Sequence, residues 1–258
     1  MTMGATPLHA ELEKDGALLR LRLSRPKANI VDAAMIAALR SALAQHLSSA
    51  RLRAVLLDAD GPHFSFGASV EEHLPGSCGA MLGELHALIL QLVASPVPVL
   101  VAVRGQCLGG GLEVAAAGHL IFAAPGAMFG QPEIKLAVFA PAASCLLPEK
   151  IGPSRSEDLL FSGRSIGAEE AYRIGLVNAL ADDPSHAALA YFEEHYASRS
   201  ASSLRSAVGA ARYDFVSRIR RKLAEVERLY LEELMATNDA VEGLTAFIAK
   251  RPPEWEDR

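Results

Sequence analysis

The segment Gly105-Gln-Cys-Leu-Gly-Gly-Gly-Leu-Glu-Val-Ala-Ala-Ala-Gly118 carries the most information about this chain. It follows the apolar run Val97–Val103, which is typical of a buried strand. Three successive glycines allow a sharp turn off that strand, and the Leu and Ala residues behind them favour a helix. Such a turn presents free N–H groups at a helix N-terminus, which suits an anion, a phosphate or an oxyanion. A close-packed turn without a ligand explains the glycines equally well.

Strand and helix patterns alternate on both sides of this segment. Further apolar runs with strand character are Leu18–Leu23, Ala54–Asp58, His119–Ala123 and Leu176–Leu180. Helical patterns lie around Ala33–Leu47, Gly79–Val93, Leu112–Ala117, Ser154–Phe161 and Ala168–Ile174. This alternation predicts an α/β fold with a mostly parallel sheet and crossover helices.

The pattern changes towards the C-terminus, where no convincing strand follows Pro184. An apolar stripe at helical spacing consists of Phe215, Ile219, Leu223, Val226, Tyr230 and Leu234. After a break at Thr237–Asp239, Asp239-x-x-Glu242 could cap a last helix. We expect an α/β core over residues 1–195 and a helical region over 196–258, which either mediates oligomerisation or covers the core of its own chain.

Composition excludes several classes of protein. Half of the 258 residues are hydrophobic, and the formal charge of −5 gives no basic footprint, so we expect neither disorder nor nucleic-acid binding. The least charged stretch, Gly105–Pro132, contains Glu113, glycines and prolines, which argues against a membrane span. Met1–Gly16 lacks the pattern of a signal peptide. The three cysteines are Cys78, Cys107 and Cys145, a number and spacing that fit a reduced cytoplasmic protein without zinc or disulfides.

Two glutamates in apolar settings are candidate catalytic groups. Glu113 lies at the start of the predicted helix, and Glu133 follows 20 positions later in Phe129-Gly-Gln-Pro-Glu133. Two such carboxyls suit general acid–base work on one water molecule. Each alone could equally be a capping or hydrogen-bonded surface residue, and their spacing does not show that they meet.

A second turn could supply a backbone donor. Pro62–His73 follows the predicted strand Ala54–Asp58, and Ser69-x-x-Glu72 within it is readable as a capping box. The N–H of Ala68 would point out of this turn. Two donors from separate turns can converge on one developing oxyanion, an arrangement in which losing one donor costs about 2.7–4 kcal/mol in other enzymes.

Together these stretches resemble the enoyl-CoA hydratase/isomerase (crotonase) superfamily over nearly the whole chain. The motifs that carry the resemblance are Arg25-Pro-Lys-Ala-Asn29, Phe64-Ser-Phe-Gly-Ala68, Gly105 to Glu113, Phe129 to Glu133, and Glu242-Gly-Leu-Thr-Ala-Phe-Ile-Ala-Lys250. The resemblance implies a crotonase-like spiral of ββα units. It also implies a C-terminal helical region that builds homotrimers or dimers of trimers, an acyl-CoA substrate, and no metal or other cofactor.

The resemblance also implies roles for single residues. The N–H groups of Ala68 and Gly110 match the oxyanion hole for the thioester oxygen. Glu113 and Glu133 match the two hydratase glutamates, which favours water addition or removal over isomerisation. Residues matching substrate or CoA contacts are Lys27, Ala28, Phe66, Gly67, Ser69, Phe139, Pro141, Phe247 and Lys250. The last two match a tail that often reaches a neighbouring subunit's CoA.

Two departures from the family pattern bear on the chemistry. Ser69 stands where Asp is common, and a serine can still cap the turn. Pro141 replaces a glycine whose N–H helps to hold the water, so water must be held differently. The surrounding segment, Ala137–Cys145, is similar to that of hydratases of cyclohexa-1,5-diene-1-carbonyl-CoA in anaerobic aromatic (benzoyl-CoA) degradation. There the hydroxyl adds at the β-carbon and the proton goes to the far end of the diene.

We therefore expect a hydratase that forms 6-hydroxycyclohex-1-ene-1-carbonyl-CoA, with Leu136–Leu147 lining the acyl pocket. The alternatives are a short-chain enoyl-CoA hydratase of β-oxidation and a catalytically degenerate acyl-CoA-binding scaffold. Ser165 formally matches the GxSxG nucleophile elbow, but a helix is predicted before it, so we expect it in a turn. His63 lies beside the Ala68 turn, and loop packing is its expected role.

Overall fold

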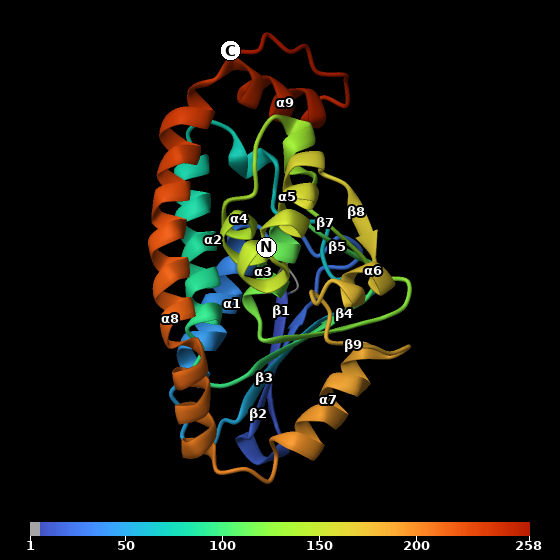
Figure 1. Cartoon of the computed structure of the whole chain (residues 1–258), viewed down its shortest axis with the longest axis vertical. Helices are drawn as coiled ribbons and strands as arrows, with labels where there is room; N and C mark the ends of the chain where they lie inside the picture. The colour runs from blue at the N-terminus through green and yellow to red at the C-terminus, as the bar shows by residue number, and fades with distance from the viewer. Residues whose placement is uncertain (1–5) are drawn as a thin grey trace, which may run out of the picture.

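The predicted parallel sheet is present in the computed structural model, which describes residues 6–258 (Figure 1). Its strands, in spatial order, are β1 (Leu8–Glu13), β2 (Leu18–Leu23), β3 (Ala54–Ala59), β4 (Val99–Val103), β6 (Leu120–Ala123) and β9 (Ala179–Leu180). β1 is antiparallel to β2, and the other pairs are parallel. All residues of β4 are buried because helices cover both faces of the sheet.

A smaller sheet lies beside the first. Its strands, in spatial order, are β5 (Gln106–Leu108), β7 (Met128–Gly130) and β8 (Ser165–Gly167). β4 in the larger sheet is followed by β5 in the smaller one and then by α3 (Gly110–Ala117). The chain repeats this path through β6 and β7 to the 3-10 helix η3 (Pro132–Leu136) and α4 (Pro141–Ile151). These are the predicted ββα units.

The predicted helices are present with ends shifted by one or two residues. The remaining helices are α1 (Ala33–His46), α2 (Cys78–Val93), α5 (Pro153–Ser162), α6 (Ala168–Arg173), α7 (Pro184–His195), α8 (Ala201–Arg228) and α9 (Asn238–Ile248). Short 3-10 helices are η1 (Lys14–Gly16), η2 (Glu71–His73) and η5 (Leu234–Ala236). Asp32 caps α1 by accepting a hydrogen bond from the Met35 N–H at 2.9 Å.

The main core lies between the sheet and helices α1 to α4, and a smaller core lies under α7 on the other face. The long helix α8 runs along the molecule beside α2 (Figure 1). Ile219 and Leu223 of α8 belong to the main core, so this helix covers the core of its own chain. The domain boundary at residue 195 and the oligomerisation of the C-terminal region stay predictions.

The predicted C-terminal apolar stripe does not lie on one continuous α-helix. Its six residues are buried or packed against the main core, as predicted. However, α8 ends at Arg228, and a π-helical turn, η4 (Leu229–Glu233), follows. The predicted cap at Asp239 is wrong, because Thr237 caps α9 by accepting a hydrogen bond from the Ala240 N–H.

Two other predictions need correction, and a third falls partly outside the described residues. The strand Leu176–Leu180 is reduced to two residues, because the N–H groups of Leu176 and Val177 donate to Ala171 at the end of α6. Ser165 lies in a strand paired with Gly130 rather than in a turn. The start of Met1–Gly16, in which the sequence predicts no signal peptide, lies outside the described residues.

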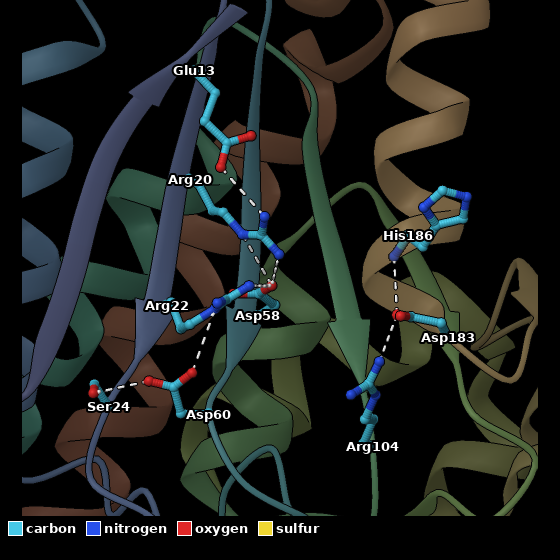
Figure 2. Close-up of polar contacts among 9 residues, drawn as sticks. All are labelled: Glu13, Arg20, Arg22, Ser24, Asp58, Asp60, Arg104, Asp183 and His186. Carbon is cyan, nitrogen blue, oxygen red and sulfur yellow. Dashed lines mark hydrogen bonds and ion pairs between the residues drawn. The ribbon is translucent and has the colours of Figure 1, made fainter.

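An ionic cluster lies on the α7 side of the sheet (Figure 2). Leucines and arginines alternate in β2, which places Arg20 and Arg22 on the same face as Asp58 of β3. The Asp58 carboxylate is 1% exposed and accepts hydrogen bonds from Arg20 Nη2 at 2.6 Å and from Arg22 Nη2 at 2.9 Å. This buried acid is therefore fully paired.

Candidate active site

A cavity of about 360 Å³ opens between the start of α3, η3 and the C-terminal helix α9. Both sequence-predicted glutamates and both predicted backbone donors line it. The predicted residues on its wall are Phe66, Gly67, Ala68, Gly110, Glu113, Glu133, Phe139, Pro141 and Phe247. The structure thus brings together four groups that the sequence could only place on separate elements.

The turn before Ala68 leaves one N–H group free. Gly67 has φ +115°, its N–H donates to Ser65 Oγ at 3.1 Å, and its carbonyl accepts from the Val31 N–H at 2.9 Å. The N–H of Phe66 donates to the Ala28 carbonyl at 2.9 Å. These bonds fix the loop immediately before Ala68, whose own N–H has no acceptor within residues 6–258.

The glycine turn supplies the second donor. Gly109 adopts φ +50°, donates to the Gly130 carbonyl at 2.9 Å and so begins α3. The N–H of Gly110 lies in the unsatisfied first turn of this helix and has no acceptor within the described chain. A Cβ atom on Gly110 would lie 3.0 Å from the Ala68 Cβ and 3.1 Å from the Ala68 nitrogen. The two free amides therefore lie side by side, which requires glycine at 110.

Glu113 is 2% exposed and projects from the first turn of α3. Its Oε1 atom accepts a hydrogen bond from the Ala143 N–H, at 2.9 Å, in the first turn of α4. Burial raises the pKa of Glu113, while the amides of Ala143 and Ala142 and the charge of His86 oppose this rise. The ionised form thus has partners despite its burial.

Pro141 is compatible with this arrangement. It occupies the first position of α4, where an N–H would have no helical partner, and the amides that follow it turn towards Glu113. The missing proline N–H therefore leaves the carboxylate-binding end of α4 intact.

Glu133 lies at the start of η3, half-buried in the cavity wall. A Cβ on Gly109 would lie 2.6 Å from its Oε1 atom, so its carboxyl group rests on the glycine turn. Burial, and then the negative charge of Glu113, raise the pKa of Glu133 to about 8. The two carboxyls interact, and neither accepts a hydrogen bond from a Lys or Arg side chain among the described residues.

Some predicted residues lie away from the cavity wall. Lys27, Ala28, Ser69 and Lys250 do not line it. Phe247 lines the cavity of its own chain, although the resemblance assigned its segment to a neighbouring subunit's CoA. Of the segment Leu136–Leu147, which the sequence predicts as pocket lining, the part after Pro141 is helical and does not line the cavity. The residues of this segment that line it are Leu136, Val138, Phe139, Ala140 and Pro141.

The predicted capping box at Ser69 is only half formed. The Glu72 N–H donates to Ser69 Oγ at 3.4 Å, but the Glu72 carboxylate accepts from the Ala33 N–H at the start of α1. His63 packs as predicted: its Nδ1 accepts from the Gln106 N–H at 3.1 Å, and its ring contacts Phe66 edge-on. It therefore supports the turn from outside the cavity.

Sequence reasoning missed several neighbours of the glutamates. Gln131 is buried, and with its amide nitrogen turned towards Glu133 it donates to both carboxylate oxygens at 3.0 and 3.1 Å. Its position two residues before Glu133 was the available signal. His73 lines the cavity, and its Nδ1 atom contacts the Ser69 carbonyl at 2.7 Å. Burial lowers the pKa of His73, so the ring is neutral near pH 7.

Three observations concern other classes of site. Among residues 6–258, no three His, Cys, Asp or Glu side chains gather in a way that could hold a metal ion. No helix in the described chain is both long and apolar enough to cross a membrane. The cysteines at 78, 107 and 145 are free and buried.

Known proteins are similar to this chain in sequence and in fold. The Enoyl-CoA hydratase/isomerase family profile matches residues 13–258. A protein of Thauera aromatica named cyclohexa-1,5-dienecarbonyl-CoA hydratase is 66% identical over 258 residues, covering 100% of both chains. Carnitinyl-CoA dehydratase of Escherichia coli is 30% identical, covering 96% of this chain and 98% of its own.

The fold agrees with this sequence relationship. The crystal structure of an enoyl-CoA hydratase/isomerase from Pseudoalteromonas atlantica superposes with a TM-score of 0.85 at 26% identity, covering 96% of this chain and 99% of that one. Since the family profile extends over most of the sequence and the architecture is shared, this chain belongs to the enoyl-CoA hydratase/isomerase family.

Proposed function

We propose that this chain hydrates cyclohexa-1,5-diene-1-carbonyl-CoA to 6-hydroxycyclohex-1-ene-1-carbonyl-CoA. The observation that carries the proposal is the single cavity shared by the amides of Ala68 and Gly110 and the carboxyls of Glu113 and Glu133. The 66% identity to the Thauera hydratase over the full length supports the choice of substrate.

The oxyanion hole is the first part of the proposed mechanism. The thioester oxygen accepts hydrogen bonds from the Ala68 and Gly110 N–H groups, which have no other acceptor within the described chain. The positive N-terminal end of the α3 dipole also stabilises negative charge on this oxygen. When the water oxygen attacks the ring, negative charge moves onto the thioester oxygen, where these preorganised donors stabilise it.

The two glutamates are assigned opposite roles by their surroundings. Glu113 accepts a hydrogen bond from the start of α4, which favours its carboxylate form and makes it the base. Glu133 has a raised pKa and keeps its proton near neutral pH, which makes it the acid. Because the carboxyls interact, they titrate as a pair.

The proposed step balances in atoms and electrons. Glu113 takes a proton from water while the water oxygen bonds to the β-carbon of the diene. The electron pair moves through the conjugated system towards the thioester oxygen and returns to the far end of the diene. That carbon takes the proton of Glu133, which leaves one double bond and a hydroxyl group in the product. No electrons leave the substrate, so the reaction requires no redox cofactor, and we propose none.

The acyl wall suits a ring. Leu82, Leu85 and Val138 are apolar, and the Phe139 ring lies on the same wall, held edge-on by Tyr230 with ring centroids 5.1 Å apart. We propose that Phe139 contacts the ring of the substrate. Pro141 closes this wall at the start of α4, where it contacts the acyl group rather than the water.

We assign the other predicted residues to the CoA portion and the cavity entrance. Phe66, Gly67 and Phe247 line the entrance. Lys27, Ala28, Ser69 and Lys250 lie outside the acyl cavity, and we propose that they contact CoA or support the loops that do. We further propose a cytoplasmic homotrimer or dimer of trimers. Exposed apolar side chains near the C-terminus, Phe247, Ile248 and Trp255, support an assembly through this region.

The deciding experiment is a substrate panel of cyclic and linear unsaturated acyl-CoA thioesters ranked by kcat/KM. The proposal predicts that the cyclic dienoyl-CoA ranks first. Preference for crotonyl-CoA would favour a short-chain hydratase. Tight binding without turnover of any thioester would favour a scaffold. The oligomeric state is measured separately by light scattering on the purified protein.

A further inference from the structure

A buried histidine lies behind the active site. His86 of α2 is 3% exposed, and its Nδ1 atom contacts the Glu227 carboxylate of α8. Its Nε2 atom is also buried and has no hydrogen-bond partner within residues 6–258. Buried polar atoms without partners are uncommon, so this one calls for an explanation.

The position of His86 connects it to the cavity. Leu82 and Leu85 line the cavity from α2, and His86 lies one helical turn after Leu82 on the same face. Helix α2 packs against α3, which carries Glu113, and against α8, which carries Glu227. The helix that carries His86 thus packs against the helix of an acid that lines the cavity and against the helix of Glu227, which is 33% exposed.

Charges around Glu113 come from several elements. The negative charge of Glu113 raises the pKa of Glu133 on η3, and it acts in the same direction on the ionisable groups of Cys145 and Tyr230. Lys222 of α8 acts on Cys145. On α2 itself, Glu84 pairs with Arg40 of α1. Only a protonated His86 ring can form an ion pair with the Glu227 carboxylate, and its positive charge then favours the carboxylate form of Glu113.

We propose that His86 and Glu227 are positioning residues that hold Glu113 as a carboxylate, ready to accept a proton from water. This inference rests on the proposed function, because it assigns the base in that reaction. Neither residue lines the cavity, so both act through Glu113 rather than on the substrate.

The first test is the pH dependence of kcat/KM for the cyclic dienoyl-CoA. Activity rises with pH as Glu113 ionises, and that acid limb is expected to move up by about one pH unit in His86→Gln and in Glu227→Gln. The kcat/KM of these variants is then about tenfold below that of the wild type at the acid end, and the difference shrinks as the pH rises. Glu225→Gln serves as the matched control, since Glu225 lies on the same helix and is 75% exposed.

A second readout does not depend on turnover. Carbon-13 NMR of the Glu113 carboxyl in a Glu133→Gln background follows the titration of this group directly. Glu227→Gln is expected to move the Glu113 titration to higher pH, and Glu225→Gln is expected to leave it in place. Because Glu227 is partly exposed, its variant decides the question even if His86→Gln does not fold.

The outcomes separate the two proposals. If the wild-type protein does not hydrate the dienoyl-CoA, the proposed function fails, while the NMR titration still tests the electrostatic coupling. If hydration occurs but Glu227→Gln leaves both the acid limb and the Glu113 titration unmoved, the role of His86 and Glu227 is overturned.

Discussion

Carboxyl groups in two parts of this molecule have opposite surroundings. On the α7 side of the sheet, burial would raise the pKa of Asp58, but hydrogen bonds from Arg22 and Arg20 outweigh it and hold that pKa below its usual value (Figure 2). In the active-site cavity, no Lys or Arg side chain of the described residues donates a hydrogen bond to Glu113 or Glu133, and both pKa values are raised. A paired acid keeps its charge and stabilises the fold, whereas an unpaired acid can change its charge during a reaction.

The largest expected effect comes from breaking the paired set. Asp58→Asn leaves two arginines without their shared carboxylate and is expected to lower the free energy of unfolding by about 3 kcal/mol. The estimate lies at the low end for a buried ion pair because Arg20 and Arg22 keep Glu13 and Asp60 as partners. Denaturant unfolding measures the change. Asp60→Asn is the control, since Asp60 is 37% exposed, and we expect it to cost less than about 1 kcal/mol.

The effects on kcat should be the reverse of the effects on stability. Asp58→Asn is expected to retain the kcat of the folded protein, whereas Glu113→Gln and Glu133→Gln each lower kcat by about a hundredfold or more. Both glutamine variants should stay folded and bind acyl-CoA, because the substitution keeps the shape of the side chain. Steady-state kinetics and binding titrations check these outcomes. A kcat within threefold of wild type in either glutamine variant would remove that residue from the mechanism.

The pH dependence of stability should distinguish Glu133 from Asp58. Glu133 binds its proton more tightly in the folded state, with a pKa of about 8 against a reference value of 4.5. The folded protein therefore holds more protons between these values, and stability is expected to fall as pH rises, by up to about 1.4 kcal/mol per pH unit. Asp58 has a lowered pKa, so its contribution is present above pH 3.8 and is lost below it.

Thermal unfolding of three proteins from pH 3 to 9 checks this prediction. Glu133→Gln should flatten the Tm profile between pH 5 and 8, and Asp58→Asn should flatten only its acid end. A Glu133→Gln profile parallel to that of the wild type would show that Glu133 titrates like an exposed acid.

The smallest expected effect concerns the cavity wall. Phe139→Ala removes the ring that Tyr230 supports and is expected to lower kcat/KM for the cyclic dienoyl-CoA by about tenfold. The effect on crotonyl-CoA should be much smaller, because a linear chain makes less contact with this wall. Equal losses for both substrates would mean that Phe139 holds the cavity together rather than selecting the ring.

Much of the fold was predictable because long apolar runs mark buried strands. β2 matches its predicted bounds, and β3, β4 and β6 differ from theirs by one or two residues. The strands of the smaller sheet were missed because three residues show no alternation. β1 was missed because most of its residues are exposed. The π-helical turn after Arg228 could not be seen in a stripe whose spacing continues through it.

The site was predictable only in part. The apolar pattern of the sequence placed Glu113 and Glu133 on separate elements. The family resemblance, not their spacing, indicated that they meet. Pro141 suggested a lost water ligand, which stays a prediction, and its place at the start of α4 leaves the amide that binds Glu113 intact. The Asp58 cluster went unnoticed, although the alternation of leucine and arginine in β2 signalled two cations on one face. Nothing in the sequence connected His86 with Glu227, which lie 141 residues apart.

Infrared spectroscopy of the carboxyl groups at pH 7 shows whether Glu133 holds a proton in the folded protein. The proposed protonation of Glu133 predicts a carbonyl band from a protonated carboxyl group in the wild-type protein that disappears in Glu133→Gln and persists in Asp58→Asn. It would be contradicted if the wild-type and Glu133→Gln spectra were identical at this pH, because Glu133 would then be ionised and could not supply the proton.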